Sequence, residues 1–134
     1  MKEHSFSLVP FPDSNIPDIA ISGTIARDHN VLTVRYSLVG AVERISIPAA
    51  VPQPSRQSEL WTSTCFEFFL AVPDRPEYWE FNLSPSGNWN VFQMDAYRRA
   101  GFREEARIDN LQLTCLHSGE KCTLKGNVDL RPII

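Results

Sequence analysis

Short segments of alternating apolar and polar residues, separated by turn residues, constrain the fold of this chain more than any other feature. The segments are rich in Val, Ile, Phe, Tyr and Thr, and 10 prolines and 6 glycines stand among them. A two-residue period places successive side chains on opposite faces of a strand. The sequence therefore predicts an all-β fold of the antiparallel β-sandwich type.

The alternating segments predict nine strands, with ends placed to within about two to four residues. They cover residues 6–9, 19–27, 31–39, 44–47, 64–72, 78–84, 88–93, 108–116 and 122–130. Pro48, Pro52 and Pro54 make the stretch up to Leu60 a loop, because the apolar segments on either side are too short to close two separate cores. We expect one domain over residues 1–134, and a loop with one helical turn at residues 97–107.

The loop at residues 73–76 sets the register of the two strands beside it. Placing Val72 opposite Glu77 pairs apolar residues on one face: Phe66 with Leu83, Phe68 with Phe81, and Leu70 with Trp79. The other face is polar and aromatic, with Glu67 opposite Asn82, Phe69 opposite Glu80, and Ala71 opposite Tyr78. These seven residues are expected in the core: Phe66, Phe68, Leu70, Trp79, Phe81, Leu83 and Trp89.

A turn at residues 84–87 brings a third strand beside this pair. With Leu83 opposite Gly87, the side chains of Trp89 and Val91 join the apolar face. Asn88 then lies opposite Asn82, and Asn90 lies opposite Glu80. The sequence thus predicts one surface that carries Glu67, Tyr78, Glu80, Asn82, Asn88 and Asn90.

The last hairpin is predicted to close through residues 117–120. This loop aligns Cys115 with Cys122 and Leu113 with Leu124. The chain has 3 cysteines and no Cys-x-x-Cys motif, so a disulfide framework or a structural zinc site is not indicated. Buried thiols in a reducing compartment act as small hydrophobic groups, and a disulfide is the less favoured alternative.

Charge and motifs exclude several classes of function. Lys plus Arg is 13 against 16 for Asp plus Glu, so the net charge of -3 does not favour nucleic acid as a partner. No apolar run reaches membrane length and no secretory signal is visible, so we expect a cytoplasmic protein without a membrane partner. His4, His29 and His117 lie in separate segments, and nucleotide-binding and Ser-hydrolase motifs are absent. We expect no metal and no cofactor.

A sheet face of rings, carboxylates and amides has the groups that bind a sugar or polyol. Rings cover the C–H faces of a sugar, and Asn and Glu hydrogen-bond its hydroxyls. A solvated outer face is the equally weighted alternative, since such faces are polar by default. Glu67 and Glu80 are diagonal neighbours, which is compatible with glycoside hydrolysis. We favour hydrolysis less, because the sequence predicts no third acidic residue on this face that would separate the pKa values of the two carboxyl groups.

Two segments carry a family resemblance. Residues 60–70 (LWTSTCFEFFL) and 78–87 (YWEFNLSPSG) resemble the DOMON-like proteins of bacteria, relatives of the family 9 carbohydrate-binding modules, and residues 89–92 and 95–98 continue the pattern. The shared features are a Trp ahead of a strand, an acidic residue in an apolar strand, and an aromatic-rich strand ending in Asn-x-Ser-Pro-x-Gly. The resemblance implies a jelly-roll-like sandwich that binds sugar or haem on a sheet face.

The resemblance also implies roles for two residues. In the carbohydrate-binding relatives, a Trp and a Glu with the spacing of Trp61 and Glu67 stack on the sugar and hydrogen-bond it. We therefore expect Trp61 at the rim of the polar face. The calcium loops and the haem ligands of relatives have no match in this sequence.

The C-terminus departs from the family pattern, because relatives continue through further strands. A truncated sandwich would leave large apolar side chains without partners and favour a homodimer through this region. The residues concerned are Leu124, Val128, Leu130, Ile133 and Ile134.

These observations predict a non-catalytic module that binds a carbohydrate or a similar polyol. The predicted site consists of Trp61, Glu67, Tyr78, Glu80, Asn82 and Asn90. The alternative is a structural or protein-interaction domain without a small ligand, and haem binding and glycoside hydrolysis rank below both.

Overall fold

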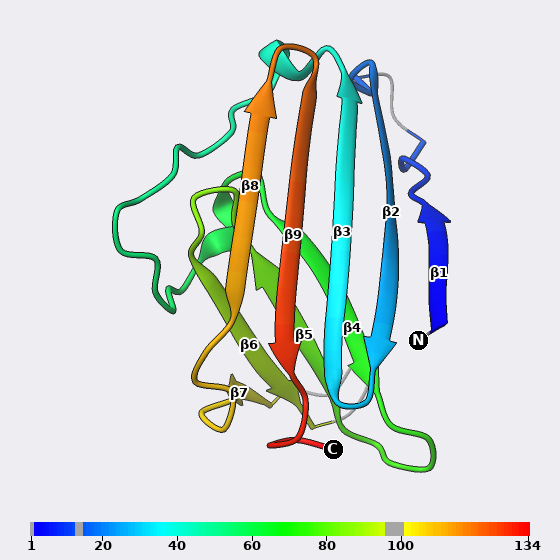
Figure 1. The fold of residues 1–134 in the computed structure, drawn as a ribbon, viewed down its shortest axis with the longest axis vertical. Helices are drawn as coiled ribbons and strands as arrows, with labels where there is room; N and C mark the ends of the chain where they lie inside the picture. Colours follow the sequence, from blue (N-terminus) through cyan, green and yellow to red (C-terminus); the bar gives the residue numbers. More distant parts are fainter. Residues whose placement is uncertain (1, 13–14, 96–100) are drawn as a thin grey trace.

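Two antiparallel sheets packed against each other make up the structure, a computed structural model that describes residues 2–12, 15–95 and 101–134. One sheet has five strands in the order β1-β2-β3-β9-β8, and the other has four in the order β4-β5-β6-β7. Figure 1 shows the five-stranded sheet in front, with β4, β5 and β6 crossing obliquely behind it. The predicted antiparallel β-sandwich is confirmed.

The strands of the first sheet are β1 (Lys2–Ser7), β2 (Ile19–Asp28), β3 (Val31–Gly40), β8 (Gln112–Ser118) and β9 (Lys121–Asp129). Those of the second are β4 (Phe66–Ala71), β5 (Tyr78–Leu83), β6 (Trp89–Met94) and β7 (Phe102–Glu104). Two 3-10 turns, η1 (Val42–Arg44) and η2 (Leu60–Thr62), lie between β3 and β4. Within the described residues, no helix is long and apolar enough to cross a membrane.

The core lies between the sheets and takes alternate residues from each strand, as the two-residue period requires. On β3 the inward residues are Leu32, Val34, Tyr36 and Leu38, all buried. All seven residues expected in the core are there: Phe66, Trp79, Phe81, Leu83 and Trp89 are buried, and Phe68 and Leu70 pack against them. The Phe68 and Phe81 rings stack with centroids 4.4 Å apart.

The predicted register of β4 and β5 is confirmed at the six pairs of the ladder, from Phe66–Leu83 to Ala71–Tyr78. Phe66 lies opposite Leu83, Phe68 opposite Phe81, and Glu67 opposite Asn82. The loop after Val72 therefore sets the faces as expected. Apolar residues face the core, and the acidic and amide residues face outward.

The predicted register of β5 and β6 has the right faces but is wrong by two residues. Leu83 pairs with Trp89, not with Gly87, and Asn82 pairs with Asn90. The connection is wider because the hydroxyls of Ser84 and Ser86 bond each other at 2.7 Å and bond the local backbone. Gly87 has a φ of 98° in this loop, a conformation that favours glycine.

Because of this wider loop, Asn88 lies outside β6 and is not paired with Asn82. Its side-chain oxygen accepts a hydrogen bond from the Ser55 backbone N–H at 3.0 Å. The expected pairing of Asn88 with Asn82 is thus wrong, as is that of Asn90 with Glu80.

The predicted register of the last hairpin is also wrong by two residues, because the hairpin closes through a two-residue turn. Ser118 pairs with Lys121, and Gly119 between them has a φ of 56°. Cys115 therefore lies opposite Leu124, although its sulfur is still 3.7 Å from that of Cys122. The three cysteines are free thiols, as the favoured prediction had it.

Two further predictions of secondary structure are wrong. Residues 44–47 do not form a strand: η1 ends at Arg44, and Ile45 and Ile47 pack against the core without a ladder partner. Residues 102–104 form β7 against the end of β6, where a loop with a helical turn was expected. Part of that expected loop, residues 97–100, lies outside the described residues, as do residues 96–98 of the family pattern.

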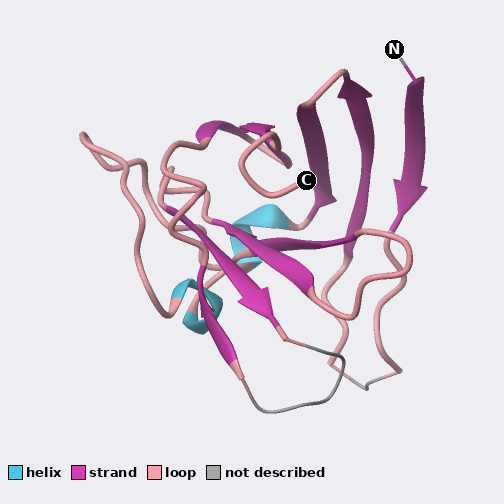
Figure 2. Cartoon of the chain, turned by 90° about the horizontal axis from the view of Figure 1, so that it is seen from below, coloured by secondary structure: helices cyan, strands magenta, loops and turns pink. Residues whose placement is uncertain are grey.

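Four of the five residues that were expected to form a C-terminal interface are buried within the chain, so that expectation is wrong for them. Leu124, Val128, Leu130 and Ile133 are 1–5% exposed, and Ile134 alone is 43% exposed. The reason is that β9 lies inside the five-stranded sheet, between β3 and β8. The C-terminus lies in the middle of the view from below (Figure 2), whereas β1 stands at its margin. The homodimer stays an untested prediction without this physical basis.

Candidate functional site

The outer face of the four-stranded sheet gathers most of the predicted site residues. Three rows run across it in register: Glu67, Asn82 and Asn90; then Phe69, Glu80, Phe92 and Glu104; then Ala71, Tyr78, Met94 and Phe102. We call this the polar-aromatic face. It combines rings with carboxylates, because every second residue of β4, β5 and β6 points away from the core.

Glu67 and Glu80 are diagonal neighbours at the centre of this face. Glu67 is exposed and Glu80 half-buried, and neither carboxylate forms an ion pair or a hydrogen bond within the described part of the chain. Partial burial raises the pKa of Glu67. Burial, and then the charge of Glu67, raises the pKa of Glu80, while the adjacent Asn82 amide offsets part of this rise. Both carboxylates are therefore free to accept hydrogen bonds from a ligand.

Asn82 is a buried polar residue of this face without a hydrogen-bond partner among the described residues. It is 1% exposed, and neither its amide nitrogen nor its amide oxygen makes a hydrogen bond. The amide lies near Glu80 and favours its charged form, but the two groups do not have the geometry of a hydrogen bond. Enclosed amides are nearly always hydrogen-bonded, so an unpartnered one indicates a missing partner, such as a water or a ligand group.

Asn90, directly opposite Asn82, has the contrary environment. It is 0% exposed, its oxygen accepts from Arg56 Nη1 at 2.6 Å, and its nitrogen donates to Glu104 Oε2 at 2.7 Å and to the Gln57 carbonyl at 3.0 Å. Its hydrogen-bonding capacity is used within the chain. Asn90 is therefore on the predicted face, but its enclosed amide is engaged within the chain, and its role in a site stays a prediction.

Arg56 fastens the long loop after η1 to the sheet. Besides Asn90, it donates to the carbonyls of Glu105 (2.9 Å) and Ile108, and its guanidinium lies 4.6 Å from the centroid of Trp89. This loop leads into η2 and so positions Trp61. Sequence reasoning missed Arg56, because nothing local marks a contact between residues so far apart in the chain.

Aromatic side chains flank the carboxylates. Trp61 is 52% exposed, and its ring packs edge-on with the ring of Phe92, with the two ring centroids 6.3 Å apart. The ring centroids of Phe92 and Phe102 are 5.8 Å apart, and on β4 and β5 those of Phe69 and Tyr78 are 6.2 Å apart. Trp61 thus lies at the rim of the face and is not enclosed, the condition for a stacking role.

Three of these rings were not among the predicted site residues. Phe69 is 60% exposed and Phe102 is 65% exposed, while Phe92 is buried beneath Trp61 and Phe102. The alternation of β4 and β6 already places Phe69 and Phe92 on this face, so the sequence pattern was sufficient to predict both rings there. Phe102 had no signal, because β7 was not predicted.

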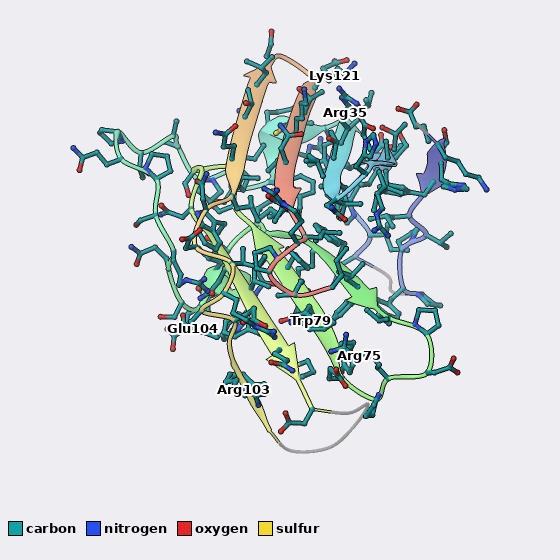
Figure 3. All side chains as sticks on the ribbon, turned by 60° about the horizontal axis from the view of Figure 1, so that its bottom comes forward. Arg35, Arg75, Trp79, Arg103, Glu104 and Lys121 are labelled. Atoms are coloured by element: carbon teal, nitrogen blue, oxygen red, sulfur yellow. The ribbon has the colours of Figure 1, made fainter. Side chains whose placement is uncertain are left out.

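Glu105 follows β7 and ties it to β5 from the core side. Its carboxylate accepts from Trp79 Nε1 at 3.0 Å and from Arg107 Nη2 at 2.7 Å. Burial raises the pKa of Glu105, but these hydrogen bonds outweigh it and lower the pKa to about 2. Trp79 lies at the centre of Figure 3, with Glu104 on β7 to its left.

The described residues contain no group of three or more His, Cys, Asp or Glu side chains that could hold a metal ion. The structure thus brings together Glu67, Tyr78, Glu80 and Asn82, with Trp61 at their rim. These residues can stack on a ligand and hydrogen-bond it.

The fold and this face define the class: a β-sandwich protein with a polar and aromatic outer sheet. No protein-family model matches the chain, and a search of curated proteins finds no match. Among solved structures, the chain is similar to a Bacteroides uniformis protein provisionally described as carbohydrate-binding, with a TM-score of 0.70 and 15% sequence identity. The similarity covers 98% of this chain but 61% of that protein. At this identity the comparison shows a shared fold.

Proposed function

We propose that this chain is a non-catalytic module that binds a carbohydrate or a similar polyol on the polar-aromatic face. The observation that carries the proposal is the combination on one face of exposed rings, two unpartnered carboxylates and an unpartnered amide. An ordinary solvated face does not enclose an amide without a partner.

Each group has a role that sugar chemistry requires. Trp61 and Phe69 offer ring faces to the C–H groups of a sugar. Glu67 and Glu80 accept hydrogen bonds from neighbouring hydroxyls, and Tyr78 can donate and accept. Asn82 is enclosed beside these carboxylates, where its amide favours the charged form of Glu80.

Two comparisons support the proposal. The Trp61–Glu67 spacing resembles that of the family 9 carbohydrate-binding modules, and both residues lie on the polar-aromatic face or its rim. The Bacteroides uniformis neighbour is provisionally described as carbohydrate-binding, and the chain spans 61% of its length. The DOMON-like assignment belongs to this proposal.

We propose binding rather than hydrolysis for a physical reason. A glycosidase needs one carboxyl that stays protonated and one that stays ionised, so their environments must push the two pKa values apart. Here burial raises the pKa of both Glu67 and Glu80, and no described cation lies beside either. The pair therefore has no described cation that would hold one carboxylate ionised as the nucleophile.

Glycan-array screening followed by calorimetry tests the proposal. Trp61→Ala is expected to weaken binding of the best glycan at least about fivefold, since stacking on an aromatic is worth about 1 kcal/mol or more. Val39→Ala is the control, because Val39 is 47% exposed on β3 of the other sheet and is not part of the polar-aromatic face. Absence of any binding, or equal loss in both variants, would favour the alternative of a domain without a small ligand.

A screen with chromogenic glycosides tests the absence of catalysis. We expect no turnover by the wild type. Turnover that disappears in Glu67→Gln would show a glycosidase and contradict the non-catalytic part of the proposal.

A further inference from the structure

A groove lies on the outer face of the five-stranded sheet, on the opposite side of the sandwich from the polar-aromatic face. Its volume is about 640 Å³, and all five strands line it. This volume is within the range of about 300–1,000 Å³ that is usual for ligand sites. In Figure 3, Arg35 on β3 and Lys121 on β9 lie at the top, far from Arg103 and Glu104 on β7.

The groove is lined by two rows of side chains in register across the sheet. One row is Ser5, Thr24, Arg35, Lys125 and Thr114, and the other is Ser7, Ser22, Ser37, Thr123 and Leu116. Seven of these ten residues carry a hydroxyl, which both donates and accepts hydrogen bonds. Five strands spaced about 4.8 Å apart give the rows a length of about 19 Å, which suits a chain-like ligand.

Two cations face each other in the middle of the groove. Arg35 and Lys125 are exposed and directly opposite on β3 and β9. Like charges in this position destabilise a sheet. Neither side chain forms an ion pair or a hydrogen bond with the residues that the structure describes, so no carboxylate relieves the repulsion.

This positive charge is local, since the whole chain has a net charge of -3. The polar-aromatic face presents unpartnered carboxylates and repels an anion. The groove presents unpartnered cations between hydroxyls and attracts one. The two faces therefore suit ligands of opposite charge.

We propose that the groove binds an acidic saccharide, a glycan chain that carries carboxylates. One carboxylate lies between Arg35, whose planar fork can donate two parallel hydrogen bonds, and Lys125. The sugar hydroxyls bind the rows of serine and threonine on either side. This second site is independent of the neutral-ligand site proposed above.

Calorimetry with trigalacturonate tests the proposal, and its fully methyl-esterified form is the matched neutral ligand. The wild type is expected to bind the free acid at least about tenfold more tightly than the ester, with an affinity that falls as salt rises. The double variant R35Q/K125Q should lose at least about tenfold in affinity for the acid. Lys121→Gln, which removes a cation from the same strand outside the groove, should change the affinity less than about twofold.

Further variants separate binding from folding and from the first site. R35Q/K125Q removes two repelling charges, so its melting temperature is expected to equal or exceed that of the wild type. Arg35→Lys keeps the charge without the fork and should have an intermediate affinity. Trp61→Ala should bind trigalacturonate like the wild type, even if the polar-aromatic face binds nothing.

Three results would overturn the proposal. The first is equal affinity for the acid and the ester, and the second is equal weakening by Lys121→Gln and the double variant. The third is binding of inorganic sulfate or phosphate as tightly as trigalacturonate with the same dependence on Arg35 and Lys125, because the hydroxyl rows would then recognise no saccharide.

Discussion

Asn82 and Asn90 offer a matched pair of substitutions that tests whether an enclosed amide is kept for a ligand. The two residues lie directly opposite each other on β5 and β6, and both are almost fully buried. Asn90 has its hydrogen bonds within the chain, whereas both polar atoms of Asn82 lack a partner. Replacing each by Leu, which has nearly the same shape, removes the same amide from contrary environments.

The expected changes in stability have opposite signs. An unsatisfied buried polar group costs about 1–3 kcal/mol, so Asn82→Leu is expected to raise the free energy of unfolding by about that amount. For 134 residues the unfolding entropy is about 0.28 kcal/mol/K, so the melting temperature should rise by about 4–11 °C. Asn90→Leu leaves Arg56, Glu104 and the Gln57 carbonyl without their partner and should cost at least about 3 kcal/mol.

Urea unfolding and calorimetric melting of the ligand-free proteins measure both changes, and unchanged m-values would show that the comparison is valid. Asn82→Leu should also bind the best glycan more weakly than the wild type, because Glu80 loses the amide that favours its charged form. A gain in stability with a loss of binding is the signature of a residue kept for function. If Asn82→Leu destabilises the protein as much as Asn90→Leu does, the amide is satisfied in solution and the reasoning is wrong.

Three further predictions follow from the charged residues. Glu105→Gln should lower stability near neutral pH and flatten its pH dependence. The pKa of Glu105 is lowered to about 2, so its ionised form stabilises the fold above about pH 4.5 and this stability is lost as pH falls toward 2. Melting curves between these pH values should show the variant less stable at the upper end and converging with the wild type at the lower. Glu80→Gln should have the opposite pH dependence. The pKa of Glu80 is raised, so its contribution to stability is complete below about pH 4 and is lost as pH rises. The melting temperature of the variant should therefore exceed that of the wild type at about pH 7 but not at about pH 4. Arg56→Met should lower the free energy of unfolding by about 3 kcal/mol or more, because it removes the hydrogen bonds to Asn90 and to the carbonyls of Glu105 and Ile108 and the contact with Trp89. Urea titration would show a smaller loss if other contacts hold the loop.

The sheet faces could be predicted from the sequence because they depend on neighbours close in the chain. A short loop, residues 72–77, joins β4 and β5 closely enough to fix their register, and the apolar pairs Phe68 with Phe81 and Leu70 with Trp79 follow from it. The register beyond Leu83 could not be predicted, because hydroxyl bonds within the loop at Ser84 and Ser86 widen it. An error of two residues keeps every side chain on its face, so the face survived the wrong register.

What each residue does on its face depends on contacts from far along the chain. Asn82 and Asn90 are equivalent in sequence terms: both are asparagines at outward positions of aromatic-rich strands. Arg56 contacts Asn90 across 34 positions of the chain and engages its amide, while no such residue reaches Asn82. The sequence therefore predicts a polar face but does not divide it into structural and binding residues.

The groove on the five-stranded sheet could not be predicted from the sequence either, because it depends on residues that are still farther apart in the chain. Arg35 and Lys125 are separated by 90 positions, and each is an unremarkable outward cation on its own strand. They become neighbours only because β9 inserts beside β3, between the N-terminal hairpin and β8. That insertion also buries Leu124 and Val128, the residues expected to form a dimer interface. One feature of topology thus removes an apolar surface from the C-terminal region and creates a charged groove on its outer side, and neither follows from a strand considered alone.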